Sequence, residues 1–307
     1  MKVSELMYPP TRVSPGTSMI ELAKIMKEGN TGVVLVELDG GNYGIVTERD
    51  ILYKVVAEDA DFIKTKARDI MTENIRTIGP DDDTARASQL FNTHNIRRLL
   101  VTEGGAIKGI VSNKDTARCN IFIYDEYVQM LSEKTDEKHT EILRQKASEI
   151  MREVTRVDSE ISVLNAAKMM KEQLVGEAIT SIGEGYGIIT ENDVLFKVVA
   201  NGYHPGEIKV KEVCTPIHTT IDSNKMVRDA SSLFNVRNIR RLPVVDGGKV
   251  TGIITEKNIS KYCVFAYTET IKALEELDPE SAKSLSEFDD HRMGIFVKSN
   301  IKSKSKD

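Results

Sequence analysis

The sequence has little of what marks a secreted, membrane or metal-binding protein. Its three cysteines, Cys119, Cys214 and Cys263, have no Cys-x-x-Cys spacing, so reduced thiols and a cytoplasmic location are expected. No apolar run reaches the roughly 18 residues of a membrane helix, and the start, MKVSELMYPP, lacks the apolar core of a signal peptide. The five histidines show neither His-x-x-x-His nor His-Glu-x-x-His spacing, which argues against a dedicated metal site.

A surplus of positive charge is also missing. The chain has 42 lysine and arginine residues against 47 aspartate and glutamate residues, which gives a net charge of −5. General affinity for nucleic acid usually requires a basic domain, so nucleic acid is the disfavoured partner. The lysine-rich end, KSNIKSKSKD, is the candidate for such a contact, and its composition is typical of a disordered tail.

What the chain does have is a seven-residue phrase that occurs four times. The copies begin at Gly44, Gly109, Gly187 and Gly252 and follow the pattern Gly-x-x-Thr/Ser-x-x-Asp/Asn. The spacing from the first copy to the second equals that from the third to the fourth, so the second half of the chain repeats the first at a constant offset. GIVTERDILYKVVA at 44–57 matches GIITENDVLFKVVA at 187–200 at ten of fourteen positions. This periodicity predicts four repeats built as a duplicated pair.

Each repeat has the same predicted order of elements. In the first, Thr17–Gly29 has the apolar spacing of a helix, and 32–38 (GVVLVEL) is a continuous apolar run typical of a buried strand. A second short strand is predicted at 43–46, and Thr47 then begins another helix. A unit of about 55 residues buries its own sheet poorly. We therefore expect the units to pack in pairs.

The predicted fold is α+β with α/β-type repeats: four βαββα units that form two tandem pairs. The units are expected at 1–58, 66–124, 147–201 and 209–267. The charged segment 125–146 is predicted to be a connecting helix, and 268–307 a C-terminal helix with a flexible basic tail. No long segment then remains for a catalytic centre, so we expect no enzymatic activity.

The repeated phrase lies where a strand ends and a helix begins, and it has two interpretations. Thr followed by an acidic residue three positions later resembles a capping box. Alternatively, the helix N-terminus and the hydroxyl bind an anion, while the carboxylate accepts hydrogen bonds from two ribose hydroxyls. Four copies favour the second interpretation, which suits a nucleotide. The residues concerned are Thr47, Asp50, Ser112, Asp115, Thr190, Asp193, Thr255 and Asn258.

These features resemble a known family. Over roughly residues 1–267 the chain is similar to proteins of four cystathionine-β-synthase (CBS) domains, whose tandem pairs bind adenine nucleotides in the cleft between paired units. The gamma subunit of the AMP-activated kinase is one of them. The resemblance rests on the closing Thr-x-x-Asp, on the strand RLPVVD at 241–246, and on openings at Met7, Met71, Met151 and, in the fourth unit, Cys214. In such proteins the Asp of the closing motif holds the ribose.

The resemblance also implies a role for two arginine pairs. Basic residues just before the Leu-Pro-Val strand often reach phosphates across the cleft, and the first repeat has Gly32 and Val33 at these positions. The matching residues of the even repeats are Arg97, Arg98, Arg240 and Arg241. Because a guanidinium matches phosphate geometry with two parallel hydrogen bonds, we assign a phosphate role to these arginines. Arg98 is assigned to the site of Asp50, and Arg241 to that of Asp193.

Two features of the sites are less regular. The fourth motif has Asn258 where the family has Asp, so it loses a charged acceptor, and hydrogen bonds to charged groups contribute about 1.5–3 kcal/mol. Binding there is expected to be weak. For the adenine, the family's early-strand position corresponds to Thr11, Val13, Thr155 and Val157. These four residues fit the core equally well.

Together these observations predict a cytoplasmic adenine-nucleotide sensor that signals by ligand-dependent docking to an unknown protein partner. AMP, ADP and ATP are the expected ligands, with no catalytic cofactor and no metal. The apolar stripes of the helices 51–56 and 194–199 are the expected docking faces between the two pairs, within the chain or in a homodimer. Two alternatives stay open: a regulatory subunit of a separate enzyme that binds S-adenosylmethionine, and a nucleic-acid-binding regulator.

Overall fold

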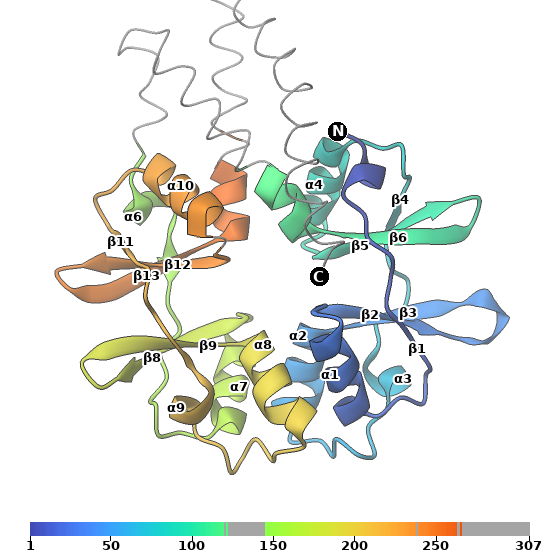
Figure 1. Ribbon diagram of the computed structural model, residues 1–307, viewed down its shortest axis with the longest axis horizontal. Coiled ribbons are helices and arrows are strands. Elements are labelled where there is room, and N and C mark those ends of the chain that lie inside the picture. Colours follow the sequence, from blue (N-terminus) through green and yellow to red (C-terminus); the bar gives the residue numbers. More distant parts are fainter. Residues whose placement is uncertain (120, 122–144, 238, 263–264, 266–307) are drawn as a thin grey trace, which may run out of the picture. The chain divides into compact units, whose positions relative to one another are not determined.

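The computed structural model describes residues 1–119, 121, 145–237, 239–262 and 265 (Figure 1). The expected connecting helix lies outside these residues except for its last two positions, and the expected C-terminal helix and basic tail lie wholly outside them. Everything below concerns the described part of the chain.

The first repeat confirms the predicted order of helix, strand, strand and helix. A short strand precedes them and pairs in parallel with the second strand, as in a βαββα unit. Its elements are η1 (Val3–Glu5), β1 (Arg12–Val13), α1 (Met19–Glu28), β2 (Val33–Glu37), η2 (Asp39–Gly41), β3 (Tyr43–Thr47), α2 (Glu48–Ile51) and the π-helical turn η3 (Leu52–Val56). Ser18 begins α1 because its side chain accepts a hydrogen bond from the Glu21 amide.

The second repeat has the same plan with longer strands. Its elements are α3 (Ala67–Ile70), β4 (Thr77–Ile78), α4 (Thr84–Thr93), β5 (Arg98–Glu103) and β6 (Ala106–Ser112), followed by helical residues 113–119. The strands β5 and β6 form a hairpin around Gly104 and Gly105, both of which have positive φ. Glycine tolerates this backbone region without steric cost, which explains the Gly-Gly turn.

The third and fourth repeats repeat this plan. The third contains α6 (Ala147–Ile150), β7 (Arg152–Glu153), α7 (Val163–Glu172), β8 (Glu177–Ile182), β9 (Gly185–Thr190), α8 (Glu191–Asp193), the π-helical turn η5 (Val194–Val198) and η6 (Val199–Asn201). The fourth contains α9 (Val210–Val213), β10 (Thr215–Pro216), β11 (Ile221–Asp222), α10 (Val227–Arg237), β12 (Arg241–Asp246) and β13 (Lys249–Thr255), followed by helical residues 256–262. The four sheets are ordered β1-β2-β3, β4-β5-β6, β10-β9-β8 and β11-β12-β13-β7.

The chain divides into two compact units that do not coincide with its halves. The odd-repeat unit contains Pro9–Ile75 and Val154–His218, from the first and third repeats. The even-repeat unit contains Met1–Tyr8, Arg76–Glu153 and the described residues from Thr219 onward. Each unit thus combines one repeat from each tandem pair.

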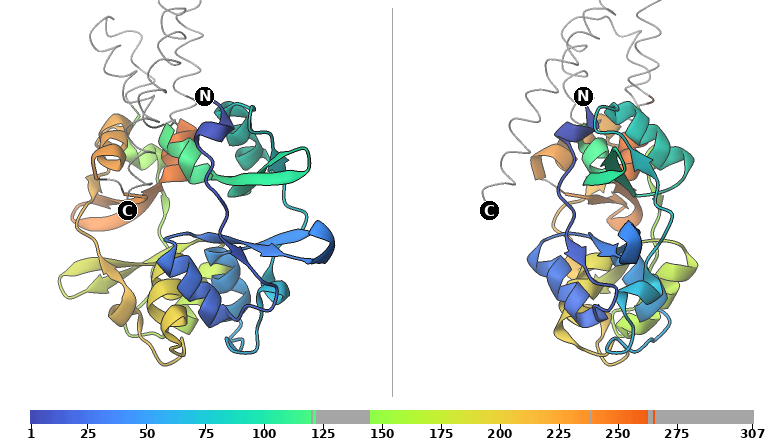
Figure 2. Two further views of the ribbon diagram at one scale, coloured as in Figure 1. Left: turned by 45° about the vertical axis from the view of Figure 1, so that its right-hand side comes forward. Right: turned by 90° about the vertical axis from the view of Figure 1, so that its right-hand side faces the viewer.

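The odd-repeat unit is held by one continuous apolar core. Both expected docking faces lie inside it, because Ile51, Leu52, Val55 and Val56 pack in the same cluster as Val194, Leu195, Val198 and Val199. All eight are at most 1% exposed. The blue and yellow helices of these two repeats lie side by side in Figures 1 and 2. The Tyr53 hydroxyl also donates to the carbonyl oxygen of Val175 at 2.9 Å. The two faces therefore dock within the chain.

The even-repeat unit has a different interior. Its described residues form two apolar clusters: one surrounds Leu99 and Phe91 of the second repeat, and the other surrounds Leu242 and Phe234 of the fourth and includes Ile121 of the second. The helices 113–119 and 256–262 take the place of the apolar docking helices, but they carry Arg118 and Lys261 where the odd repeats have Tyr53 and Phe196. Polar contacts therefore hold a larger part of this unit together.

The opening segments of the repeats pack on glycines of the repeated phrase. A Cβ added at Gly44 would lie 2.6 Å from the Met71 sulfur, and one at Gly109 would lie 3.1 Å from the Met7 sulfur. A Cβ at Gly252 would lie closer still to the Met151 sulfur, and one at Gly187 would meet the Ile182 side chain first and the Cys214 sulfur at 3.1 Å. Each opening residue therefore packs on the other repeat of its tandem pair. The first glycine of the phrase is required by this close approach rather than by a positive φ.

Candidate ligand-binding site

The four motifs occupy equivalent junctions, where β3, β6, β9 and β13 end and a helix begins. At each junction one oxygen of the final Asp or Asn accepts hydrogen bonds from the amide and the hydroxyl of the Thr or Ser three positions earlier. The amide and hydroxyl distances are 2.9 and 2.6 Å for Thr47 to Asp50 Oδ2, and 2.9 and 2.5 Å for Thr190 to Asp193 Oδ2. Ser112 bonds to Asp115 in the same way. The capping interpretation is therefore confirmed at all four motifs.

Capping occupies one carboxylate oxygen and leaves the other. In the odd repeats this second oxygen, Oδ1, contacts a lysine four residues later: Lys54 lies 2.8 Å from Asp50, and Lys197 lies 2.7 Å from Asp193. The Thr215 hydroxyl also donates to Asp193 Oδ1 at 3.1 Å. The two lysine side chains are 44% and 43% exposed, whereas the carboxylates are 13% and 11% exposed. A solvent-accessible lysine is a replaceable partner, so Oδ1 is the atom available to a ligand.

These lysines also join two elements. Lys54 Nζ donates to the carbonyl oxygen of Ile70 at 2.7 Å, and Lys197 Nζ donates to that of Val213 at 2.6 Å. Both carbonyls close short helices, α3 and α9, where a cation offsets the negative end of the helix dipole. Neither lysine was among the predicted site residues, although both recur four residues after the motif Asp in the sequence.

The even motifs have no such lysine. Cys119 and Tyr262 occupy the equivalent positions, and both are buried. Burial raises the pKa of the Cys119 thiol, so this cysteine stays protonated and inert. In the fourth motif Asn258 Oδ1 accepts from the Thr255 amide at 3.2 Å and from the Thr255 hydroxyl at 2.5 Å. Asn258 therefore keeps the cap, and its remaining atom is a donor where aspartate has an acceptor.

The even-repeat arginines stand next to the motif of their own sheet. In the strand register Arg98 lies opposite Ser112, and Arg241 lies opposite Thr255. Arg98 Nη1 donates to the carbonyl oxygen of Arg97 at 3.0 Å, while its Nε is buried without a hydrogen-bond partner among the described residues. In the third repeat the equivalent position is the buried Glu177. The assignment of Arg98 to Asp50 and of Arg241 to Asp193 stays a prediction.

The glycine that replaces Arg97 and Arg240 in the odd repeats has a structural cause. The residue that follows the motif threonine, Glu48 or Glu191, is buried there. Its amide donates to the carbonyl oxygen of Gly32 or Gly176. A Cβ added at Gly176 would lie 2.7 Å from Glu191 Oε1, and one at Gly32 would lie still closer to Glu48. A side chain at this position would displace the buried carboxylate. In the odd repeats the close approach of this glutamate thus coincides with a glycine, whereas the fourth repeat combines the equivalent buried Glu256 with Arg240.

The adenine candidates lie at the edge of the odd-repeat core. Val13 and Val157 belong to the core cluster and are 7% and 6% exposed. Thr155 is buried, and its hydroxyl hydrogen-bonds to Gln173 Oε1 at 2.5 Å. Thr11 contributes its carbonyl oxygen to the Leu35 amide at 2.8 Å. A core role is therefore shown for the two valines, and the adenine role of all four residues stays a prediction.

Charged residues meet differently in the two units. In the odd-repeat unit Arg49 Nε lies 2.9 Å from Glu191 Oε1, and its guanidinium lies over the Tyr53 ring at 5.3 Å. In the even-repeat unit burial, and next the nearby Arg240, lowers the pKa of Lys114 to about 8. Burial also raises the pKa of Glu256, which lies 3.4 Å from Arg118. The described part of the chain contains no cluster of His, Cys, Asp or Glu suited to a metal ion.

Comparison with known proteins identifies the class to which these repeats belong. The CBS domain family model matches residues 3–57, 67–119 and 210–264, more than half of the chain, so the chain belongs to the CBS-domain family. The third repeat lies outside these matches, yet its Glu177 pairs with Thr190 in the register in which Val33 pairs with Thr47. The resemblance to CBS-domain proteins that the motifs indicated is therefore confirmed. CBS domains are regulatory modules.

Individual relatives cover different parts of the chain. An uncharacterized protein of Methanopyrus kandleri is 32% identical over 121 residues, which are 38% of this chain and 62% of that protein. A CBS domain-containing protein of Arabidopsis thaliana is 26% identical over 261 residues, 76% of this chain and 48% of the relative. The chain thus spans less than two thirds of the length of either relative.

One solved structure has a similar fold over most of the chain. It is that of a Methanocaldococcus jannaschii protein proposed to be an archaeal homologue of γ-AMPK, and it matches with a TM-score of 0.63. The match covers 85% of this chain and 99% of that protein at 19% sequence identity, a level at which the likeness concerns the fold alone.

Among the described helices of this chain, none combines the length and apolarity needed to cross a membrane.

Proposed function

We propose that this chain is an adenine-nucleotide-binding regulatory protein that signals through ligand-dependent docking to another protein. The observation that carries the proposal is the second oxygen of Asp50 and Asp193. Each carboxylate caps its helix with Oδ2 and holds Oδ1 at a half-exposed lysine. A pair of ribose hydroxyls would replace that lysine as the donor, because a carboxylate oxygen accepts hydrogen bonds from either group.

The other motif residues have complementary roles in this proposal. The hydroxyls of Thr47 and Thr190 lie at helix starts, where backbone N–H groups favour an anion. Arg98 and Arg241 would bind phosphate, since their guanidinium groups can form two parallel hydrogen bonds to its oxygens. Ser112 and Asp115 would form a weaker site, because the first repeat offers Gly32 and Val33 instead of arginines.

Calorimetry on the full chain tests the proposal. Titration with AMP, ADP and ATP is expected to show at most two tight sites per chain, the ones that contain Asp50 and Asp193. Ligand binding should also raise the melting temperature, because a ligand that binds only the folded state stabilises it. An absence of both heat and thermal shift with all three nucleotides would contradict nucleotide binding.

The Asp193→Asn variant separates ligand binding from capping. Asn258 shows that asparagine caps the same junction with one oxygen, so the variant should keep the cap and lose only the second acceptor. Nucleotide affinity at this site is expected to fall about tenfold, which corresponds to about 1.4 kcal/mol. Calorimetry on the variant measures this change.

Lys197→Met is the matched control, because it removes the same ion pair and leaves the carboxylate in place. Affinity in this variant should stay equal or rise, since the ligand no longer displaces a lysine. If Asp193→Asn and Lys197→Met weaken nucleotide binding equally, the carboxylate acts through the ion pair and the ribose role is wrong.

Regulation adds a requirement beyond binding. A ligand changes docking only if it has different affinities for two conformations of the protein. Hydrogen exchange of the full chain with and without nucleotide should therefore change beyond the motif helices, for example in α3 and α9, which Lys54 and Lys197 link to the motif. Protection confined to the motif residues would indicate binding without a conformational signal.

A further inference from the structure

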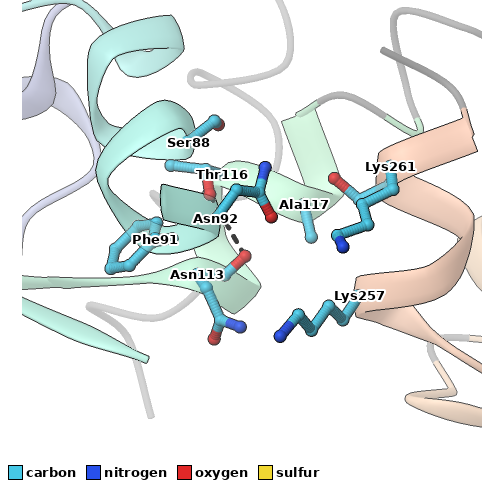
Figure 3. A pocket seen from close by; sticks show the side chains of 9 residues that line it. Ser88, Phe91, Asn92, Asn113, Thr116, Ala117, Lys257 and Lys261 are labelled. Atoms are coloured by element: carbon cyan, nitrogen blue, oxygen red, sulfur yellow. Dashed lines mark hydrogen bonds between the residues drawn. The ribbon is translucent and has the colours of Figure 1, made fainter. Parts of the chain in front are cut away.

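An open pocket lies within the even-repeat unit, and none of the capping Asp or Asn residues lines it. Its volume, including space open to solvent, is about 310 Å³. Three helices line it: α4 and 113–119 from the second repeat, and 256–262 from the fourth. Figure 3 shows the amino groups of Lys257 and Lys261 directed from the fourth-repeat helix toward the second repeat. The described residues that line the pocket include two lysines and no acidic side chain.

The internal repeat supplies a counterpart with which this pocket can be compared. The offset that relates the two halves of the chain places Asn113 of the pocket in correspondence with Glu256, and Arg118 in correspondence with Lys261 of the pocket. In the counterpart, Arg118 Nε lies 3.4 Å from Glu256 Oε1, and this carboxylate is 9% exposed. The counterpart thus contains a cation together with its carboxylate. The pocket contains the cation, Lys261, and a neutral amide at the position of the carboxylate.

The described residues that line the pocket supply no such carboxylate. Lys261 forms no ion pair with any described residue, and Lys257 Nζ donates to the neutral Asn95 Oδ1 at 2.7 Å. The hydroxyl oxygen of Ser88 is buried and has no hydrogen-bond partner within the described ranges. Burying a polar group without a partner costs free energy, and hydrogen bonds to an ionised group are the stronger ones. These donors fit a ligand that carries negative charge.

We infer that this pocket binds a small oxyanion, a carboxylate or a phosphate, whose oxygens take the position that the Glu256 carboxylate has in the counterpart. The two ammonium groups would supply the charge, and the side chains of Asn92, Asn113 and Ser88 would supply neutral donors. Because the lining comes from both even repeats, the bound anion joins the second repeat to the fourth. Occupancy therefore stabilises the even-repeat unit. The pocket includes Asn113 and Lys257 of the repeated phrase but none of the proposed nucleotide-binding residues, so the inference does not rest on the proposed function.

The test uses the full chain with sodium acetate and inorganic phosphate as probes, at constant ionic strength set by sodium chloride. Thermal unfolding and calorimetric titration should show saturable stabilisation by at least one probe. The probe that saturates at the lower concentration identifies the carboxylate or the phosphate as the preferred class. The Asn113→Glu variant supplies the missing carboxylate from the chain itself. It should melt at a higher temperature than the wild type without either probe, and its affinity for the effective probe should fall at least tenfold.

A second variant keeps the inference testable if Asn113→Glu fails to fold. Lys261→Gln removes one cation from an exposed position, and it should also reduce the affinity at least tenfold. Lys249→Gln, which changes an exposed lysine of the same unit outside the pocket, is the matched control and should leave the affinity unchanged. The inference is overturned if neither probe stabilises the wild type. It is equally overturned if Lys261→Gln and Lys249→Gln respond to the probes as the wild type does.

Discussion

At the residue scale, the final Asp or Asn of each motif caps a helix with one side-chain atom and leaves its second terminal atom for another contact. Asp50 and Asp193 offer an acceptor as this second atom, whereas Asn258 offers an amide donor. All of them cap a helix through the other oxygen. Since capping is common to the four motifs, it does not distinguish binding motifs from silent ones. The chemistry of the second atom does.

The Asn258→Asp variant should give the fourth motif the second acceptor oxygen that the other three motifs have. The cap would be retained, because aspartate offers the same oxygen to the Thr255 amide and hydroxyl. The second oxygen would then accept from a ribose hydroxyl, which should strengthen nucleotide binding at this motif by on the order of 1 kcal/mol. Calorimetry on the full chain should show an added or tightened site, with Thr255 unchanged. Identical titration curves for the variant and the wild type would contradict the role given to the carboxylate.

Lys114 should make the stability of the even-repeat unit depend on pH. Its pKa is lowered from the ordinary value of 10.5 to about 8, first by burial and then by Arg240, while Glu256 and Asp115 act in the opposite direction and Arg118 lowers it further. Between these two values the unfolded chain binds more protons than the folded chain, so stability rises with pH. The gain from Lys114 is expected to be on the order of 2 kcal/mol.

Denaturant unfolding of the wild type and of Lys114→Met measures this contribution. The two measurements are made at about pH 7.5 and about pH 10, near the two ends of the range in which Lys114 is protonated in the unfolded chain but not in the folded one. The rise in stability should be smaller in the variant. Lys249→Met, at an exposed position, is the control and should retain the wild-type rise. An equal rise in Lys114→Met and in the wild type would show that other groups cause the pH dependence.

At the element scale, the opening segments connect repeats that are adjacent in sequence. Tyr8 forms a β-bridge with Ile110 of the second repeat, and Thr72 forms one with Ile45 of the first. The sulfur-bearing residue beside each such contact lies against a glycine of the repeated phrase. Because a glycine has no Cβ, the opening segment can approach the strand closely. The first residue of the phrase, glycine, thus allows close packing. Its Thr or Ser and its final Asp or Asn form the cap and the proposed ligand site.

Replacement of one of these glycines should be costly. In Gly252→Ala the new Cβ would overlap the Met151 side chain, including its own Cβ at 3.0 Å, so the opening segment must shift. Overpacking of this kind typically costs about 1–3 kcal/mol. Denaturant unfolding measures the loss. Gly185→Ala, also in a strand but with its nearest neighbour 3.8 Å away, is the matched control and should change stability little. Equal stability of both variants would contradict the packing role.

At the scale of the whole molecule, the two units differ in how their repeats are joined. The odd-repeat unit has one apolar core that spans both repeats, whereas the even-repeat unit has two apolar clusters and a charged helix contact. Apolar burial is nearly independent of salt and pH, while charge contacts respond to both. The even-repeat unit is therefore the part whose stability depends on ions, which is consistent with the anion pocket inferred for it.

This arrangement predicts that the second half of the chain does not stay monomeric when it is separated from the first half. A fragment of residues 147–267 would expose Val194, Leu195, Val198 and Val199, which the first repeat covers in the full chain. Contiguous exposed apolar faces drive association. Light scattering coupled to size-exclusion chromatography should therefore find the fragment as dimers or larger species. Leu195→Asp should reduce this association, and a monodisperse wild-type monomer would contradict the prediction.

Local information in the sequence determined much of this protein. The four repeats, the helix and strand order within them and the junctions that carry the motifs follow from periodicity and turn chemistry, which act over a few residues. The CBS-domain family could also be recognised from these short patterns, and the family comparison confirms it. The sequence located the residues Thr47, Asp50 and Asn258 at the start of helices for the same local reason.

Tertiary structure alone decided which repeats share a core and what surrounds each motif. An apolar stripe such as 51–56 can be buried within the chain or in a dimer with equal benefit, so its pattern does not name its partner. The contacts of Lys54 with Ile70 and of Met151 with Gly252 join segments whose spacing follows no local period. The pocket beside Asn113 is also such a case, because Asn113 belongs to the second repeat and the pocket lysines come from a helix of the fourth. Long-range packing brings these groups together, and no short pattern records it.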